Sequence, residues 1–423
     1  MSGPSWSNCD IERARRTLVW RGRDMGANSQ VRTIIHTARA IVGALLLASC
    51  AAPVDFDDGG SIRTLYPATG AAPTTVHFAT TRCNHRPATE QAGTLQELFS
   101  KRCWDAALKN EDVVRLGFGL AEDPRVTCGS AEVAFAPADG DKKAATTVTT
   151  PVSAPCHSDF EELRRAVLAT PCRCALVFVH GYNTTFAFGI KRTAQLASDL
   201  RYPGLPIMFS FAAGGRFDDY VNDVEAAELS TRALHRMLVA LTREDAAGRP
   251  SIDVIAHSLG TRMVMRAASD DTALPSLRYI LLAAPDIDPA AFLQLAQNVA
   301  PHVKRLTVYT ASSDVAMSAS AAAHNGRDRL GGGVTPTVMQ DLPHTELIDA
   351  TERAVDQYAH SYFAEAKIVL DDMAGALKGT PAAERKPLVC EQKGKLTACR
   401  VPCPEGANCG PPWYARLLRW LLD

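Results

Sequence analysis

The segment SIDVIAHSLGTRMVMRA, residues 251–267, changes character at a single serine. Residues 252–256 are mostly apolar, include β-branched side chains and have the length of a buried strand. From residue 259 onward the apolar side chains recur every three or four positions, which is the spacing of a helix. A strand that becomes a helix so abruptly must bend sharply, and the bend falls at Ser258.

A serine on such a bend is held above the carboxyl edge of a parallel sheet, where its hydroxyl is accessible to a ligand. The residues two before and two after it must be small for the turn to close, and here they are Ala256 and Gly260. AHSLG is therefore a G-x-S-x-G nucleophile elbow with alanine in the first small position, and we predict that Ser258 is a nucleophile. We expect His257 to support the turn. The alternative is an ordinary serine N-cap at the start of a helix.

The surrounding sequence alternates between strand-like and helix-like stretches, which predicts an α/β fold with a mostly parallel, doubly wound sheet and helices on both faces. The strand-like runs are nearly continuous apolar segments, as in strands covered on both faces. We predict strands at 175–181, 206–212, 251–257, 277–285, 305–312 and 335–342, and helices at 186–200, 219–246, 259–269, 289–300 and 361–377.

Composition shifts divide the chain into five parts. Strand-like runs from Thr75 onward predict that the third part, the N-terminal extension, contains β-strands. The predicted parts are a leader at 1–50 with a possible true start at Met25, a tether at 51–74, an N-terminal extension and linker at 75–155, the α/β domain at 156–378, and a Cys-rich tail with a terminal amphipathic helix at 379–423.

The leader has the anatomy of an export signal. Arg32 and Arg39 precede an apolar run at 40–48 that is too short to span a bilayer. The run ends in Leu-Ala-Ser-Cys, which resembles the bacterial lipoprotein cleavage box, with Cys50 as the lipidated residue. We therefore expect an exported envelope lipoprotein, anchored through Cys50 to a membrane, with the outer membrane favoured by Ala51. The alternative is a simple secretory signal.

Cysteine usage and charge narrow the possible partners. Twelve cysteines occur, and without Cys9 and Cys50 ten remain, an even number that predicts disulfides in an oxidising compartment. The sequence has no Cys-x-x-Cys pair and no His-Glu-x-x-His motif, so we predict no metal site. Glycine-rich phosphate-binding motifs are also absent, so no cofactor is expected. A net charge of −1 gives no reason to expect a nucleic acid partner.

A serine nucleophile needs a base and a carboxylate that orients the base, in the chain order serine, acid, histidine. We favour Asp314 as the acid because it follows the penultimate strand, with Asp286 and Asp288, one strand earlier, as alternatives. We favour His360 as the base because it directly precedes the last predicted helix, with His344 as the alternative. Both histidines follow the strand predicted at 335–342.

A tetrahedral oxyanion needs two backbone N–H donors, one of them from the residue after the nucleophile. Leu259 provides that donor. The second is expected from Tyr182, in the loop after an earlier strand, where Gly181 lets the chain approach closely and His180 supports the turn. The alternative is a plain strand-to-helix turn without this role.

The motifs FATTR, VFVHGYNTTF, FSFAAGG, IDVIAHSLGTR, LLAAPDID, VYTASSD and HSYF, taken in order, resemble an α/β-hydrolase family of unknown function whose members are usually described as esterases. The resemblance covers residues 75–83 and about 171–370. It implies the α/β-hydrolase fold and, by motif position, a triad of Ser258, Asp314 and His360. This sequence departs from the family at FSFAA, where Trp-Pro-Ser is more common, so the substrate preference stays open.

The combined hypothesis is an exported, membrane-anchored serine hydrolase that cleaves a small-molecule or lipid carboxylic ester through an acyl-enzyme. An acyltransferase would use the same acyl-enzyme. A binding or assembly protein of the envelope that keeps the fold without turnover is the remaining alternative. Thioester and amide substrates, the disulfide pairing and the oligomeric state are left open by the sequence.

Overall fold

The computed structural model describes residues 73–84, 118–135, 146–156, 159–214, 220–270, 273, 275–353, 360–403 and 409. Four predicted features lie outside the described residues: the leader, the proposed lipidation site Cys50, nearly all of the tether and the terminal amphipathic helix. No helix in the described ranges is both long enough and apolar enough to cross a membrane.

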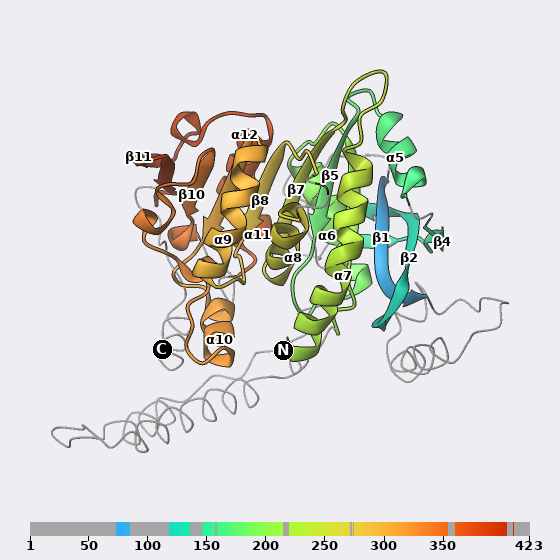
Figure 1. The fold of residues 1–423 in the computed structure, drawn as a ribbon, viewed down its shortest axis with the longest axis horizontal. Coiled ribbons are helices and arrows are strands. Elements are labelled where there is room, and N and C mark those ends of the chain that lie inside the picture. The colour runs from blue at the N-terminus through green and yellow to red at the C-terminus, as the bar shows by residue number, and fades with distance from the viewer. Residues whose placement is uncertain are drawn as a thin grey trace, which may run out of the picture. The chain divides into compact units, whose positions relative to one another are not determined.

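Six parallel strands form the centre of the sheet, in the order β10-β9-β8-β7-β5-β6 (Figure 1). Their bounds are β5 Cys174–Val179, β6 Leu205–Ser210, β7 Ser251–His257, β8 Tyr279–Ala283, β9 Arg305–Thr310 and β10 Thr345–Asp349. Because all six run the same way, the loops that follow them meet at one edge. This arrangement confirms the predicted mostly parallel α/β sheet.

Strands outside the predicted domain core extend the sheet at both ends. Beyond β6 lie β1 Thr74–Asn84, parallel to β6, and then antiparallel β2 Phe118–Phe135, with β3 Thr146–Val148 and β4 Val152–Pro155 paired to β2. Beyond β10 lie β12 Leu396–Arg400, parallel to β10, and β11 Val389–Lys393, antiparallel to β12.

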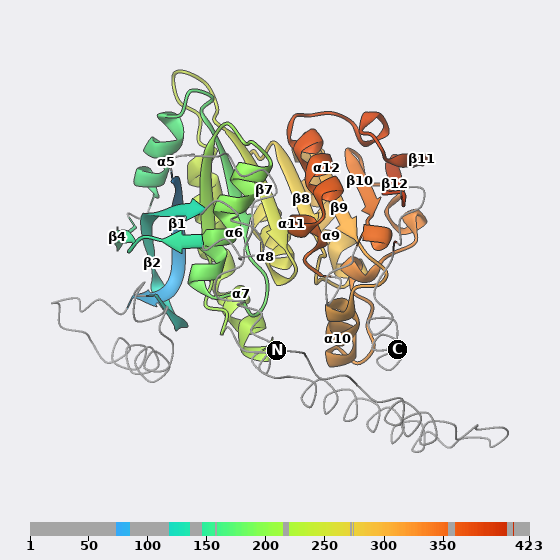
Figure 2. The ribbon, with the colours of Figure 1, turned by 180° about the vertical axis from the view of Figure 1, so that it is seen from behind.

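Helices cover both faces of the sheet, which explains the continuous apolar runs of its strands. Along β5, Val177 and Val179 pack against one layer while Leu176 and Phe178 pack against the other. Figures 1 and 2 show these layers from opposite sides. The first layer contains α5 Glu161–Leu168, α7 Tyr220–Leu241, α8 Leu259–Ala268 and α9 Pro289–Val299, and the second contains α6 Phe186–Asp199, α11 Tyr362–Glu365 and α12 Lys367–Leu377.

One predicted strand is wrong. Residues 336–339 of the expected 335–342 strand form a short 3-10 helix, Pro336–Met339, and the strand itself, β10, begins at Thr345. The proline has no N–H to give to a ladder and has a backbone angle suited to the first helical position. The last predicted helix is also divided, with α11 ending at Glu365 and α12 beginning at Lys367.

All nine cysteines among the described residues are in disulfide bonds, which confirms the prediction of disulfides. Four pairs lie within the described ranges: Cys128–Cys156, Cys172–Cys174, Cys390–Cys399 and Cys403–Cys409.

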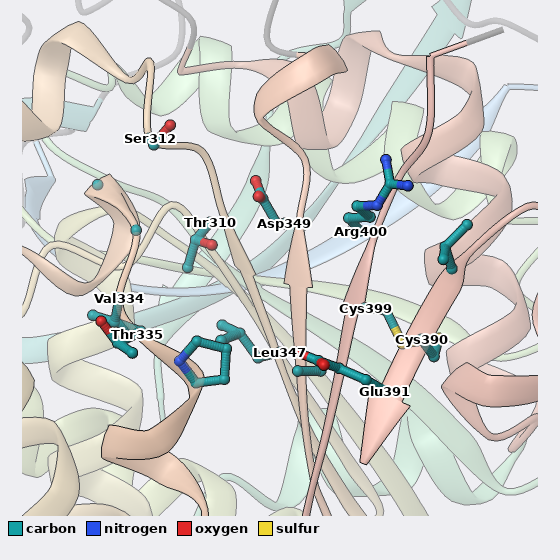
Figure 3. Close-up of a pocket in the computed structure, with 15 residues that line it drawn as sticks. Thr310, Ser312, Val334, Thr335, Leu347, Asp349, Cys390, Glu391, Cys399 and Arg400 are labelled. Atoms are coloured by element: carbon teal, nitrogen blue, oxygen red, sulfur yellow. A yellow bond between two sulfur atoms is a disulfide. The ribbon is translucent and has the colours of Figure 1, made fainter. Parts of the chain in front are cut away.

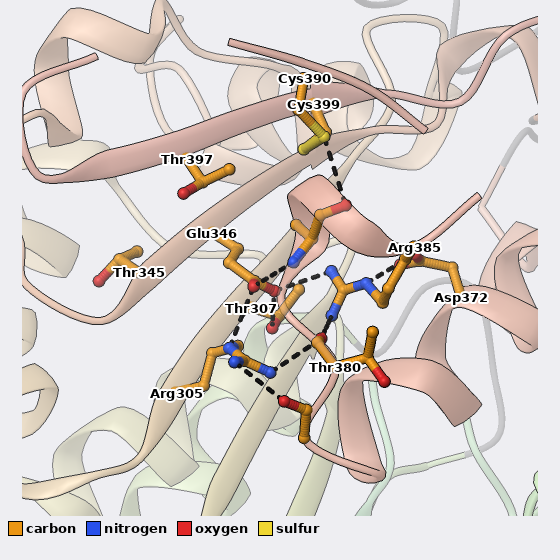
Figure 4. Close-up of polar contacts among 12 residues, drawn as sticks. Arg305, Thr307, Thr345, Glu346, Asp372, Thr380, Arg385, Cys390, Thr397 and Cys399 are labelled. Atoms are coloured by element: carbon orange, nitrogen blue, oxygen red, sulfur yellow. Dashed lines mark hydrogen bonds and ion pairs between the residues drawn. A yellow bond between two sulfur atoms is a disulfide. The ribbon is translucent and has the colours of Figure 1, made fainter. Parts of the chain in front are cut away.

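A buried charge cluster fastens the C-terminal segment to the sheet (Figure 4). Glu346 on β10 is 4% exposed and pairs with Arg385 at 2.8 Å and with Arg305 at 3.0 Å. The oxygen of Glu346 that faces Arg305, Oε1, also accepts from the N–H of Ala382 at 2.8 Å. Arg385 in turn pairs with Asp372 on α12 at 2.9 Å. The chain between α12 and β11 is thereby held by one carboxylate from a central strand.

We expect Glu346→Gln to lower the free energy of unfolding by about 3 kcal/mol, because it leaves two guanidinium groups without their shared carboxylate. Glu391→Gln on the neighbouring β11 is the matched control, since Glu391 and its partner Lys393 are 58% and 41% exposed and such pairs contribute under about 1 kcal/mol. Urea denaturation of the disulfide-intact protein measures both. Equal losses in the two variants would contradict this assignment.

Candidate active site

Ser258 lies on the bend between β7 and α8, as the sequence predicts. Its backbone has φ 50° and ψ −121°, a left-handed φ that is rare for any residue except glycine and is characteristic of strained positions at functional sites. The bend is fixed on both sides by the end of β8 and the residues that follow it: the Ser258 N–H donates to the carbonyl of Ala283 at 3.0 Å, and the N–H of Asp286 donates to the Ser258 carbonyl at 3.2 Å. The serine is 3% exposed.

The small residues around the bend are required by close contacts with the end of β5. A Cβ atom at Gly260 would lie 2.3 Å from the carbonyl oxygen of His180, and one at Gly181 would lie 2.7 Å from the Cβ of Ser258. Ala256 is completely buried within β7. The loop that follows β5 therefore passes directly against the nucleophile elbow.

Asp314 and His360 form a hydrogen-bonded pair at the same edge of the sheet. Oδ2 of Asp314 lies 2.7 Å from Nδ1 of His360, while Oδ1 accepts the N–H of Met317 and so caps α10, Val315–Ala323. Asp314 is 1% exposed. The ring of His360 lies 4.5 Å, centroid to centroid, from the ring of His257, the residue before Ser258. The structure thus brings the favoured acid and base to the elbow.

Asp286 and Asp288 are committed to other partners. Asp286 is buried and accepts hydrogen bonds from Arg329 Nε, the Tyr220 hydroxyl and the Ser320 hydroxyl, each at 2.7 Å. Asp288 caps α9 by accepting the N–H groups of residues 290 and 291. Neither carboxylate hydrogen-bonds a histidine within the described chain, so the geometry favours Asp314 over both.

The position of the alternative base, His344, argues against that role. Because the final strand begins at Thr345 and not at residue 335, His344 lies at the amino end of β10. Its carbonyl accepts the N–H of Leu306 near the amino end of β9. That is the opposite edge of the sheet from Ser258, whereas His360 follows the carboxyl end of β10.

Of the two histidines that were expected to support turns, His180 is buried and His257 is partly buried. His180 lies between the carbonyl of Gly181, 2.9 Å from Nδ1, and the hydroxyl of Ser210, 3.0 Å from Nε2. Burial and the nearby Arg82 guanidinium lower the pKa of His180 to about 3. Burial and the neighbouring His360 hold the pKa of His257 well below its usual value, and its ring stacks on Phe363 at 4.4 Å.

Arg82 is a residue of this region that the sequence analysis did not single out, although it ends the quoted motif FATTR. It is completely buried at the end of β1. Its guanidinium donates to Ser210 Oγ at 2.9 Å, to the carbonyl of Ala213 at 2.9 Å and to the carbonyl of Thr184. One side chain therefore joins the loops that follow β5 and β6.

The two residues predicted to donate backbone N–H groups to an oxyanion, and three aromatic rings, also lie at this edge of the sheet. Leu259 is the first residue of α8, and its backbone N–H has no acceptor within the helix. Tyr182 follows Gly181 in the loop against Ser258, and its ring packs edge-on against Tyr220 at 5.3 Å. Tyr220 packs in the same way on His324 at 5.7 Å. The three rings make a continuous aromatic surface beside the elbow.

A cavity of about 800 Å³ opens farther along this edge (Figure 3). Its floor carries Thr310, Asp349 and Arg400, which the parallel register places side by side on β9, β10 and β12. One wall is the segment 332–336 and the other is β11. The residues that line the cavity do not include Ser258, Asp314 or His360. We therefore place the candidate active site at the elbow and the Asp314–His360 pair, and not at this cavity.

Among the described residues, no cluster of three or more His, Cys, Asp or Glu side chains is arranged to hold a metal ion.

The sequence profile of a family described as alpha/beta hydrolase of unknown function (DUF900) matches residues 157–376. Among curated proteins, none matches the chain. Solved structures that resemble it include an esterase from Pyrococcus furiosus, with 10% identity over 60% of this chain and 85% of that one, and a TM-score of 0.29. A monoacylglycerol lipase from Paleococcus ferrophilus has 14% identity over 60% and 95% of the two chains, with a TM-score of 0.24.

A glucuronoyl esterase from Teredinibacter turnerae has 10% identity over 85% of this chain and 79% of that one, with a TM-score of 0.25. Structural similarity at this level carries no argument about activity. The profile match covers more than half of the chain, and the observed topology and the bend at Ser258 agree with it. The chain belongs to the α/β-hydrolase family of unknown function.

Proposed function

We propose that this protein is a serine hydrolase that cleaves carboxylic esters through an acyl-enzyme. The observation that carries the proposal is the 2.7 Å contact between Asp314 and His360 at the sheet edge where Ser258 occupies a strained bend. A buried carboxylate on one imidazole nitrogen beside a serine elbow is the arrangement that activates a hydroxyl for acyl transfer.

Each of the three groups has a distinct task in this mechanism. Asp314 accepts a hydrogen bond from the Nδ1–H group of His360, which leaves Nε2 as the nitrogen that takes the proton from the Ser258 hydroxyl. Ser258 then attacks the acyl carbonyl carbon, and His360 returns the proton to the departing alcohol. Water, activated by the same imidazole, releases the acid and regenerates the serine.

The negative charge that develops on the carbonyl oxygen is assigned to the backbone N–H groups of Leu259 and Tyr182. The Leu259 group sits at the amino end of α8, where the helix dipole favours negative charge. The aromatic surface of Tyr182, Tyr220 and His324 beside the elbow is suited to an apolar part of the substrate.

We also propose that the protein is exported and anchored to a membrane through a lipidated Cys50. Support comes from the cysteines: all nine that the structure describes are in disulfides, which persist in oxidising compartments and are rare in the cytosol. Cys50 itself lies outside the described residues. Globomycin treatment of cells and mass spectrometry of the N-terminal peptide test this assignment.

Labelling with a fluorophosphonate, followed by peptide mapping, tests the nucleophile and its base. We expect label on Ser258, none in Ser258→Ala, and ester hydrolysis reduced by about 10⁴-fold or more in His360→Ala. His344→Ala is the matched control and should keep wild-type activity, because His344 lies at the opposite edge. A folded wild-type protein that neither takes up label nor hydrolyses short-chain or medium-chain esters would refute the proposal in favour of a binding role.

Asp314→Asn tests the orienting carboxylate separately from its helix cap. The amide oxygen can still accept the N–H of Met317, so α10 keeps its cap, but the charge facing His360 is lost. We expect kcat to fall by about 10⁴-fold with little change in melting temperature. Asp288→Asn, the same change at another helix cap, should leave kcat unchanged. Similar effects of the two substitutions on kcat would argue against the role of Asp314.

A further inference from the structure

A chain of hydrogen bonds runs from Arg82 to the loop beside the nucleophile. Arg82 Nε donates to Ser210 Oγ at 2.9 Å, Ser210 contacts His180 Nε2 at 3.0 Å, and His180 Nδ1 contacts the carbonyl oxygen of Gly181 at 2.9 Å. Arg82, Ser210 and His180 are at most 1% exposed, so water does not substitute for any link.

The direction of every bond in this chain is determined by its ends. A guanidinium group can only donate, and a carbonyl oxygen can only accept. His180 must therefore carry its proton on Nδ1, facing Gly181, and its bare Nε2 must accept the hydroxyl proton of Ser210. Ser210 is free to give that proton because its oxygen accepts from Arg82. The burial that keeps His180 neutral, with a pKa of about 3, preserves this pattern at any ordinary pH.

The last bond fixes the orientation of one peptide group. The Gly181–Tyr182 peptide is trans, since Lys386–Pro387 is the only cis bond in the described chain. In a trans peptide the C=O and N–H groups point in opposite directions. With the Gly181 carbonyl turned toward His180, the Tyr182 N–H is turned away from it. Gly181 itself is packed against Ser258, so this peptide borders the nucleophile.

We infer that Arg82 is a positioning residue, which acts through Ser210 and His180 to hold the Gly181–Tyr182 peptide so that the Tyr182 N–H faces the developing oxyanion. The inference rests on the proposed serine hydrolase activity. It also assigns a task to β1, which lies outside the residues that match the family profile. If the peptide turned over, a carbonyl oxygen would face the oxyanion where a donor is required.

Ser210→Ala is the sharpest test, because it interrupts the series of hydrogen bonds from Arg82 to His180 without removing a buried charge. Replacement of Arg82 would remove the hydrogen-bond donor of the Thr184 and Ala213 carbonyls, and the loss of these buried bonds would lower the stability of the fold. We expect kcat for an oxygen ester to fall about 100-fold, the effect of losing one oxyanion donor, with KM nearly unchanged because the contact forms only in the transition state.

A second readout separates positioning from general damage. Sulfur accepts hydrogen bonds weakly, so an intact oxyanion site prefers an oxygen ester over the matching thionoester. In Ser210→Ala this preference should shrink together with kcat. Ser230→Ala is the matched control: it removes another buried serine hydroxyl, one that bonds Thr81, the neighbour of Arg82, at 2.8 Å. The control should keep both kcat and the preference.

The outcomes distinguish this inference from the function on which it rests. A folded wild type that takes no fluorophosphonate label and turns over no ester overturns both. A wild type that is labelled on Ser258 and active, combined with an unchanged kcat in Ser210→Ala, overturns the positioning role alone. Equal losses on the oxygen ester and the thionoester in Ser210→Ala overturn it as well, since they would indicate a general structural effect.

Discussion

The left-handed backbone at Ser258 is the constraint on which the rest of the site depends. A non-glycine residue with φ 50° costs about 1–3 kcal/mol, and it persists only where surrounding contacts hold it. Here both backbone groups of Ser258 are hydrogen-bonded to the end of β8 and the residues just after it, and α8 begins close enough to β5 to exclude any side chain at Gly260. Strand order thus controls local chemistry: β5 and β8 flank β7, and each supplies one side of the bend.

Three aspartates follow the neighbouring strands β8 and β9. The groups that each carboxylate hydrogen-bonds distinguish them. Asp286 accepts from Arg329 and two hydroxyls, so its charge is already compensated. Asp288 caps one helix from a partly exposed position. Asp314 divides its two oxygens, one to the cap of α10 and one to His360, and is almost fully buried. The helix cap keeps this carboxylate in one rotamer, which is what a group that orients an imidazole needs.

The bend, the sheet and the placement of Asp314 and His360 at one edge could be predicted because each leaves a local signal, either a continuous apolar run or a residue just after one. The error at 335–342 arose because Val338 and the threonines nearby have strand composition, while Pro336 starts a 3-10 turn. That error alone made His344 a candidate. Arg82 could not be found, since it bonds Ser210 across 128 residues of sequence and no spacing rule connects them. Long-range pairing of buried polar groups is decided by the fold.

Strands outside the residues that match the family profile are added beside both outermost strands of the six-stranded centre, β10 and β6. The two additions have different physical consequences. At one edge, β12 pairs in parallel with β10 and β11 closes the hairpin, with the Cys390–Cys399 disulfide between directly opposed residues. This hairpin covers the backbone groups of β10, which would otherwise be an open edge, and forms one wall of the cavity. At the other edge, β1 covers β6 and also sends Arg82 beneath the loops of the site. Protection of a sheet edge and orientation of the site are therefore separate tasks, and of these two additions β1 performs both while the β11–β12 hairpin performs the first.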